Sequence, residues 1–257
     1  KSLGLVMNRH DSLRTHFEIV SDELQYIVRP LKDLLVPFEY ETLDEERISE
    51  TIKTKASIPF NLESSPLFRC HIFNIRENYN VILFNFHHII WDGTSFGIFK
   101  KDLTKIYQAL VNNEIPKLDI ISKQYSDFVN DDNKYSLSDD YNKSSEYWKE
   151  YLSGDLPILE LPTKSIRPSV MEHTGELAQF IIRGNLKRKL ENYSINNGIS
   201  LFNLFLTTFK ITLSKFSGIN DIIVGTPVNG RLSSEFDNTT GYFVNTLPIR
   251  TKLDLKK

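Results

Sequence analysis

The chain has 257 residues, of which 40% are hydrophobic and 12% aromatic, and its formal net charge at pH 7 is -2. This apolar content can build a substantial core in one large domain or in two smaller ones. A nearly neutral chain offers no general polyanion-binding surface, so no nucleic acid partner is expected. The single cysteine, Cys70, excludes a disulfide within the chain, and its apolar neighbours predict a buried structural thiol.

The sequence shows no signal peptide and no apolar run of membrane length. A cytoplasmic protein without a membrane partner is therefore the default expectation. The first residue is not Met, and the chain begins within a predicted helix that contains Leu3, Val6 and Met7. We therefore expect a piece of a longer protein, truncated at both ends, which on its own folds poorly or leaves strand edges unpaired.

Residues 1 to about 110 alternate between strand and helix patterns. Apolar and β-branched runs predict strands at 15–19, 25–28, 38–42, 67–75 and 81–90. Helices are predicted near 45–57 and 95–111. The turn-like residues 77–80 separate the last two strands, which we expect to pair as a hairpin. Together these elements predict an α/β lobe.

The middle of the chain is polar and rich in turn-forming residues. Residues 115–123 form a predicted connector. Beyond it, we expect a mobile Asn- and Asp-rich stretch at 130–142 and then a packed helix to about Leu152. Residues 154–168 contain three prolines and predict an extended crossing. The boundary placed there gives an N-terminal lobe over 1–160 and a C-terminal part over 161–257.

The C-terminal part repeats the α/β theme. A strand is predicted near 177–182, followed by a helix from Leu186 that Gly198 closes. Ser200 caps the next helix, which ends at Gly218. Because 201–213 is apolar around most of its circumference, this helix is expected to be buried. Two further strands are predicted at 222–228 and 242–250.

The segment H-H-I-I-W-D-G at residues 87–93 carries the most chemical information. If the strand continues to residue 90, alternation places His88 on the face of its apolar neighbours, where desolvation favours the neutral imidazole that accepts a proton. His87 then shares the opposite face with Asn85, which indicates a hydrogen-bonded structural role. Two imidazoles on opposite faces cannot bind one metal ion together without distortion, so no metal site is predicted.

The residues after this segment predict a turn and a helix start. Asp92 and Gly93 supply turn chemistry, and Thr94 or Ser95 supplies an N-cap for a helix that runs to about Asn112. The helix N-terminus would lie close to the strand end. Asp92 could therefore cap the helix, pair with an arginine or orient an imidazole, and the residues alone leave these three uses open.

With its spacing, the segment resembles the HHxxxDG signature of the condensation domains of non-ribosomal peptide synthetases, within the chloramphenicol acetyltransferase-like superfamily. Flanking segments agree with the family in the same order along the chain. They are R-H-D-S-L-R-T-H-F at 9–17, P-F-N-L to P-L-F-R at 59–69, Y-S-D-F at 125–128, Y-W to L at 147–152, D-I-I-V-G-T-P-V-N-G-R at 221–231 and G-Y-F-V-N-T-L-P-I-R at 241–250. Asp11 and Asn61 depart from the family's Glu and Asp.

The resemblance implies a two-lobed chloramphenicol acetyltransferase-like α/β fold, with the N-terminal lobe nearly complete and the C-terminal lobe partial. It also implies an acyltransferase that forms a peptide bond in secondary metabolite biosynthesis. The amine of one carrier-bound amino acid attacks the aminoacyl or peptidyl thioester on another carrier. The implied partners are upstream and downstream carrier domains and an adjacent adenylation domain. The domain binds no cofactor of its own, since phosphopantetheine arms on the carriers present both substrates.

The resemblance implies roles for several residues. The catalytic set is His88, His87, Asp92 and Gly93, with His88 as the principal residue, either a general base or a group that positions the amine. The N–H of Gly93 could contact the thioester. In the family, the aspartate pairs with an arginine, for which Arg14 and Arg231 are the candidates. Asn245 and Thr246 are expected to border the substrate site.

Three alternatives remain open on the residues alone, and a fourth, a heterocyclization domain, is excluded because its motif is absent. An epimerization domain has the motif HHxxxDxxSW, which fits except that Phe96 replaces the tryptophan, but residues 225–231 match condensation domains instead. A heterocyclization domain would carry an aspartate pattern in place of the histidines. A coenzyme A-dependent acyltransferase uses the same histidine motif. A non-catalytic member of the family would serve only for docking.

Overall fold

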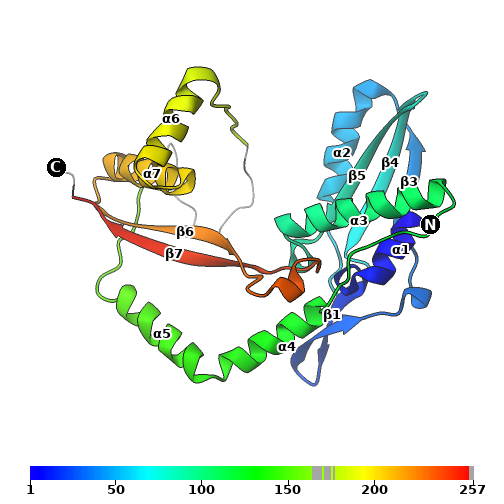
Figure 1. The fold of residues 1–257 in the computed structure, drawn as a ribbon, viewed down its shortest axis with the longest axis horizontal. Helices are drawn as coiled ribbons and strands as arrows, with labels where there is room; N and C mark the ends of the chain where they lie inside the picture. The colour runs from blue at the N-terminus through cyan, green and yellow to red at the C-terminus, as the bar shows by residue number, and fades with distance from the viewer. Residues whose placement is uncertain (164–169, 171–174, 176, 255–257) are drawn as a thin grey trace. The chain divides into compact units, whose positions relative to one another are not determined.

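The computed structural model of the protein describes residues 1–163, 170, 175 and 177–254 (Figure 1). The chain forms two compact units, one of Lys1–Tyr141 with Val228–Asn245 and the other of Asn142–Pro227 with Thr246–Lys257. These units differ from the lobes predicted with a boundary at residue 160. The segment Val228–Asn245 joins the first unit because its polar groups bond to Asp92 and Ser95, at the start of helix α3 (Gly93–Val111). The two lobes of the predicted division stay a prediction.

A three-stranded sheet forms the centre of the first unit. Its strand order is β3 (Phe38–Thr42), β4 (Phe68–Arg76) and β5 (Tyr79–Phe86), with β3 parallel and β5 antiparallel to β4. The tight turn between β4 and β5 uses Asn78 at a positive φ of 60°. The predicted hairpin is therefore confirmed. A separate hairpin pairs β1 (Thr15–Val20) with β2 (Glu23–Val28).

Helices α1 (Ser2–Arg9), α2 (Ile48–Ser57) and α3 (Gly93–Val111) complete this unit, with α1 and α3 lying side by side (Figure 1). The apolar faces of α1 and α3 share one core with the sheet, and this core includes Leu3, Val6, Met7, Leu67, Phe68, Cys70, Ile90, Trp91, Phe99 and Ile106. The predicted burial of Cys70 is confirmed, and that burial raises the pKa of its thiol to about 11. Arg9 Nε and His10 Nε2 both contact Asp102 Oδ2, at 2.6 and 3.0 Å, and this joins α1 to α3.

The stretch predicted to be mobile is instead mostly helical. Helix α4 (Tyr125–Ser136) starts in a capping box between Gln124 and Asp127, and helix α5 (Asp139–Tyr151) follows directly. Ser138 Oγ accepts the Tyr141 N–H at 3.2 Å, as an N-cap does. The prediction was wrong because Asn and Asp residues also stabilise helix starts and are here accommodated within α4 and α5. Two of the acidic residues begin α5, where they favour the helix N-terminus.

In the second unit, α6 (Gly184–Asn196) and α7 (Leu201–Ser217) precede β6 (Asp221–Asn229), and β7 (Val244–Lys252) pairs with β6. The predicted helix ends are confirmed, because Gly198 and Gly218 adopt φ values of 63° and 73° and Ser200 Oγ accepts the Asn203 N–H at 3.1 Å. Lys210 on α7 donates to Ile249 O at 2.9 Å, and so the helix is tied to β7.

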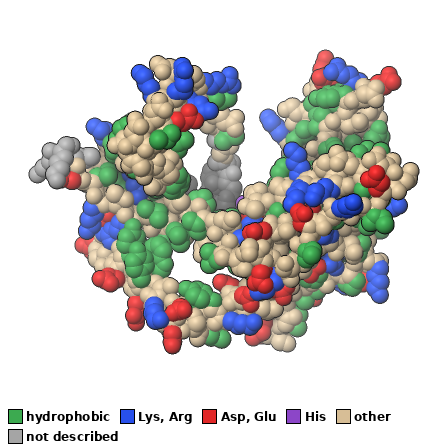
Figure 2. All heavy atoms as spheres, in the orientation of Figure 1, with side chains coloured by type: hydrophobic (Ala, Val, Ile, Leu, Met, Phe, Trp, Pro, Cys, Tyr) green, Lys and Arg blue, Asp and Glu red, His purple; other side chains and the backbone are tan. Residues whose placement is uncertain are grey.

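Two predictions in this unit were wrong. Residues 177–182 form no strand, and Leu177 and Phe180 are 81% and 86% exposed, because no strand among the described residues pairs with them. Helix α7 buries Lys210, Leu213 and Ser214 but leaves several apolar side chains exposed, so it is not buried all round. These exposed side chains are Leu201, Phe202, Phe205, Phe209 and Phe216. Figure 2 shows hydrophobic side chains at the surface in the part of the molecule that contains α7.

Within the described residues, none of the helices combines the length and the apolar character that crossing a membrane requires.

Candidate active site

The two histidines of the H-H-I-I-W-D-G segment lie just beyond the sheet. Strand β5 ends at Phe86, and a 3-10 turn covers His88–Ile90. The prediction that both imidazoles extend the strand on opposite faces was therefore wrong. The physical reason is that His87 leaves the ladder and caps the turn, since its Nδ1 accepts the Ile89 N–H at 3.1 Å. Its own N–H still bonds to Leu67 O at 2.9 Å.

The side chain of His87 serves this turn. Because Nδ1 accepts a hydrogen bond, a neutral His87 carries its proton on Nε2. The Phe60 ring packs edge-on against the imidazole, with 6.0 Å between centroids. Arg69 fixes the position of Phe60. The Arg69 guanidinium lies 3.9 Å from the centre of the Phe60 ring and donates a hydrogen bond to Pro59 O. These contacts are consistent with a structural role for His87, and that role stays a prediction.

His88 has a different environment from the one expected. Its side chain is exposed, not enclosed by the apolar residues of β5, because the chain has already turned away from the sheet. Within the described residues, the ring makes one aromatic contact, edge-on with Tyr242 at 5.2 Å between centroids. The His88 imidazole is therefore open to a molecule that approaches from solvent.

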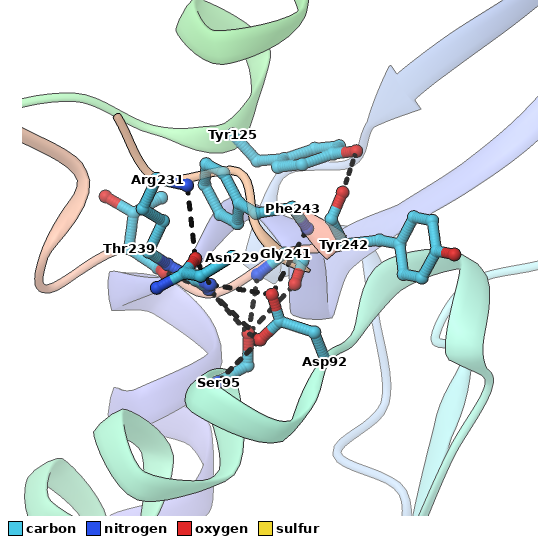
Figure 3. Close-up of polar contacts among 9 residues, drawn as sticks. All are labelled: Asp92, Ser95, Tyr125, Asn229, Arg231, Thr239, Gly241, Tyr242 and Phe243. Atoms are coloured by element: carbon cyan, nitrogen blue, oxygen red, sulfur yellow. Dashed lines mark hydrogen bonds and ion pairs between the residues drawn. The ribbon is translucent and has the colours of Figure 1, made fainter. Parts of the chain in front are cut away.

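Asp92 caps helix α3 and is buried, with 2% of the residue exposed (Figure 3). Its Oδ1 accepts the N–H and the hydroxyl of Ser95, both at 2.8 Å. Its Oδ2 accepts from Arg231 Nη1 at 2.6 Å and from the Phe243 N–H at 3.2 Å. Both oxygens are therefore occupied by protein donors, and the helix cap is Asp92 and not Thr94 or Ser95.

Arg231 is the arginine that reaches Asp92. Its side chain is only 2% exposed, and its guanidinium also donates to Thr239 O at 3.1 Å and lies 3.9 Å from the centre of the Phe243 ring. Arg14 instead pairs with Asp11 and donates to Met7 O at 2.9 Å. Of the two candidate arginines, the structure thus brings only Arg231 to the carboxylate.

The charge of Asp92 is well stabilised. Burial by itself would raise the pKa of the carboxyl group. Hydrogen bonds from Arg231 and Ser95, together with the positive charge of Arg231, outweigh burial and hold the pKa below its ordinary value. An ionised carboxylate that accepts five hydrogen bonds is suited to hold a structure together and poorly suited to accept a further proton.

Sequence reasoning missed two residues that complete this network. The one hydroxyl proton of Ser95 is shared between Asp92 Oδ1 and Gly241 O, which lies 2.9 Å from Oγ, and Oγ accepts the Gly241 N–H at 3.0 Å (Figure 3). Tyr125 OH donates to Tyr242 O at 2.8 Å, and burial raises the pKa of this phenol to about 12. One signal was present: Ser95 is a polar residue on the helix face that also carries Ile98 and Phe99.

Gly241 allows Tyr125 to pack directly against the backbone. A Cβ atom added at Gly241 would lie 2.2 Å from Tyr125 Cδ2, whereas one added at Gly97 would meet nothing within 4 Å. We expect Gly241→Ala to destabilise the first unit by about 1–3 kcal/mol, because the ring must move. Gly97→Ala, in the exposed face of α3, should be neutral or stabilising. Hydrogen exchange of peptides over 125–128 and 239–243 measures the difference, and equal protection in the two variants would contradict it.

The other predicted site residues take peripheral positions. Gly93 is the first residue of α3 and is exposed, with nothing within 4 Å of the position of a Cβ atom. Asn245 and Thr246 are exposed residues of β7, the first assigned to the first unit and the second to the other. Their contact with a substrate stays a prediction. Among the residues described, His, Cys, Asp and Glu side chains form no group of three or more able to hold a metal ion.

Comparisons with known proteins agree with the sequence pattern. The family model "Condensation domain" matches residues 1–257. One of the subunits of linear gramicidin synthase from Brevibacillus parabrevis is 39% identical over 258 residues, which cover 98% of this chain and 5% of that protein. The chain thus spans a small fraction of the length of the curated relatives that it matches.

Solved structures show the same fold. A four-domain nonribosomal peptide synthetase bound to AMP and glycine matches with a TM-score of 0.85 at 26% identity, over 100% of this chain and 19% of that one. The epimerization domain from the third module of tyrocidine synthetase B also matches with a TM-score of 0.85, at 20% identity, over 100% of this chain and 60% of that one. The second likeness concerns the fold alone. The predicted α/β fold class is confirmed.

Proposed function

The chain belongs to the condensation-domain family, and on this premise we propose that it forms an amide bond between two carrier-bound substrates. The acceptor is the amine of a carrier-bound amino acid, and the donor is an aminoacyl or peptidyl thioester on a second carrier. The observation that carries the proposal is the arrangement of the H-H-I-I-W-D-G segment. A buried Asp92–Arg231 ion pair fixes its end, while the imidazole of His88 stays accessible.

We infer different roles for the residues of the segment, and their contacts support this division. His87 is engaged through Nδ1 with the Ile89 N–H, and Asp92 has both oxygens occupied. His88 is exposed, and no hydrogen bond of its ring is found among the described residues. We therefore infer that His88 is the side chain of this segment that reaches a substrate and that Asp92 supports the structure around it.

The chemistry requires no covalent enzyme intermediate. The amine nitrogen attacks the thioester carbonyl carbon, the C–N bond forms, and the C–S bond breaks as the thiolate of the phosphopantetheine arm leaves. The nitrogen loses a proton along the way. His88 either accepts this proton as a general base or hydrogen-bonds the amine and leaves the proton to solvent. Ser95 is not a nucleophile in this scheme, because its hydroxyl is committed to Asp92 and Gly241.

We infer the partners of this domain from the domain organisation of the longer synthetases that it resembles. The four-domain synthetase and the linear gramicidin synthase relative are much longer than this chain, which spans 19% and 5% of them. We infer carrier domains before and after this domain and an adenylation domain next to it. Phosphopantetheine then belongs to the carriers as part of the substrates and is not a cofactor of this domain. A cytoplasmic location suits such a synthetase.

Condensation accounts for the sequence better than epimerization does. Phe96 occupies the position of the tryptophan in the epimerization motif, and it lies exposed in the first turn of α3. Residues 225–231 also carry the condensation pattern. Coenzyme A-dependent transfer and a purely docking role are supported by no contact among the described residues.

The test uses the intact parent synthetase with both neighbouring carriers loaded. We expect mass spectrometry to detect the amide product on the downstream carrier only when both carriers are charged. Omission of the acceptor amino acid is the matched control. Epimerized substrate without an amide, transfer from an acyl-coenzyme A with the upstream carrier unloaded, or carrier binding without any product would each contradict condensation.

A further inference from the structure

Three hydrogen bonds hold the backbone at Tyr242 and at the residues on either side of it. Its carbonyl oxygen accepts from Tyr125 OH at 2.8 Å. The preceding residue, Gly241, bonds to Ser95 Oγ through its N–H, and the N–H of the following residue, Phe243, donates to Asp92 Oδ2. Because these anchors include the buried cap of α3, the Cα atom of Tyr242 has a fixed position relative to the H-H-I-I-W-D-G segment.

The side chain of Tyr242 is free of this network. It points away from Asp92, Arg231 and Tyr125 in Figure 3, and the residue is 39% exposed. Its ring meets the imidazole of His88 edge-on, with centroids 5.2 Å apart and planes at 85°. This is the preferred geometry for two aromatic rings. A rigid backbone thus presents one aromatic ring to the exposed histidine.

The side chain of a solvent-exposed histidine samples several rotamers. The rate of a catalysed reaction is higher when the reactive group is already held in the productive orientation. The Tyr242 ring supplies such an orientation without a hydrogen bond to either ring nitrogen of His88 among the described residues. From this we propose that Tyr242 is a positioning residue, whose ring holds the His88 imidazole in its reactive orientation. The inference rests on the proposed condensation function and deepens it.

The test compares Tyr242→Leu with Tyr242→Phe in the intact parent synthetase. Tyr242→Leu removes the ring, and we expect kcat for amide formation to fall about 3- to 10-fold, the range that an aromatic pair contributes. KM for the loaded acceptor carrier should stay unchanged. Tyr242→Phe keeps the ring and should retain the wild-type kcat, because the contact with His88 is made by the ring and not by the hydroxyl. Tyr107→Leu, which removes an exposed tyrosine ring from helix α3, is the matched control and should leave kcat unchanged.

A double variant asks whether Tyr242 acts through His88. On a His88→Ala background, Tyr242→Leu should cause no further loss of the residual single-turnover rate, since no imidazole is left to orient. A full additional loss on that background, a wild-type kcat in Tyr242→Leu, or a Tyr242→Phe as slow as Tyr242→Leu would each overturn the positioning role. Failure of the wild-type synthetase to form any amide would instead overturn the proposed function, and the positioning role with it.

Discussion

Replacement of His88 by alanine is expected to slow amide formation by the parent synthetase by ~10² to 10⁴-fold, the usual contribution of a positioned acid–base group. The fold should survive, because His88 is exposed and its side chain contacts Tyr242 alone among the described aromatic rings. Binding of both loaded carriers should also persist. Single-turnover formation of the amide, followed by mass spectrometry, measures the loss, and carrier affinity is measured in parallel.

His87→Asn is the matched comparison for this experiment. An asparagine oxygen can replace the Nδ1 atom that accepts the Ile89 N–H, so the 3-10 turn at His88–Ile90 should be retained. We therefore expect a smaller loss of rate than in His88→Ala. Near-normal turnover in a correctly folded His88→Ala protein would refute the chemical role of His88. A larger loss in His87→Asn than in His88→Ala would exchange the roles assigned to the two residues.

Loss of the Asp92–Arg231 pair is expected to cost about 3–5 kcal/mol of stability, as removal of one partner of a buried ion pair does. Both side chains are almost completely buried, 2% exposed for Arg231 and 0% for Asp92. Asp92→Asn is the most informative change, because asparagine caps a helix about as well as aspartate does. Its effect therefore reports the lost charge opposite Arg231. Urea-dependent pulse proteolysis of the parent synthetase, read on peptides from this domain, measures the change.

The double variant Asp92→Asn with Arg231→Met provides the control. When both partners lose their charge, no uncompensated charge remains buried, so the double variant should be less destabilised than the sum of the single variants. Additive losses would show that the two residues act independently. Full stability of Asp92→Asn together with lost amide formation would contradict the structural role and favour a direct part in catalysis.

We expect the contribution of the Asp92–Arg231 pair to the free energy of unfolding to depend on pH. Because the folded state holds the pKa of Asp92 below its ordinary value, its contribution to stability is present above the unfolded pKa of about 3.9. That contribution is lost as the pH falls through the lower folded pKa. The stability difference between the wild type and Asp92→Asn should therefore be constant from about pH 5 upward and shrink below about pH 4. A difference that grows on acidification would contradict this linkage.

Local patterns in the sequence predicted much of the fold. The hairpin of β4 and β5, the ends of α7 at Ser200 and Gly218 and the burial of Cys70 all followed from residues close together in the chain. Each depends on a local rule: side-chain alternation, a cap or an apolar run. The mispredicted strand at 177–182 also has an apolar pattern, but a strand needs a partner that the local sequence does not provide.

The sequence by itself determined the family, the two histidines and the carboxylate that follows them, because motif residues keep a fixed order and spacing. Only the tertiary structure decided what each of these residues contacts. It chose Arg231 over Arg14 as the partner of Asp92, ended β5 before His87 and placed Tyr242 against His88. These facts depend on contacts between residues more than a hundred positions apart or on where a strand stops. Packing and hydrogen-bond partners fix both, and no short pattern contains them.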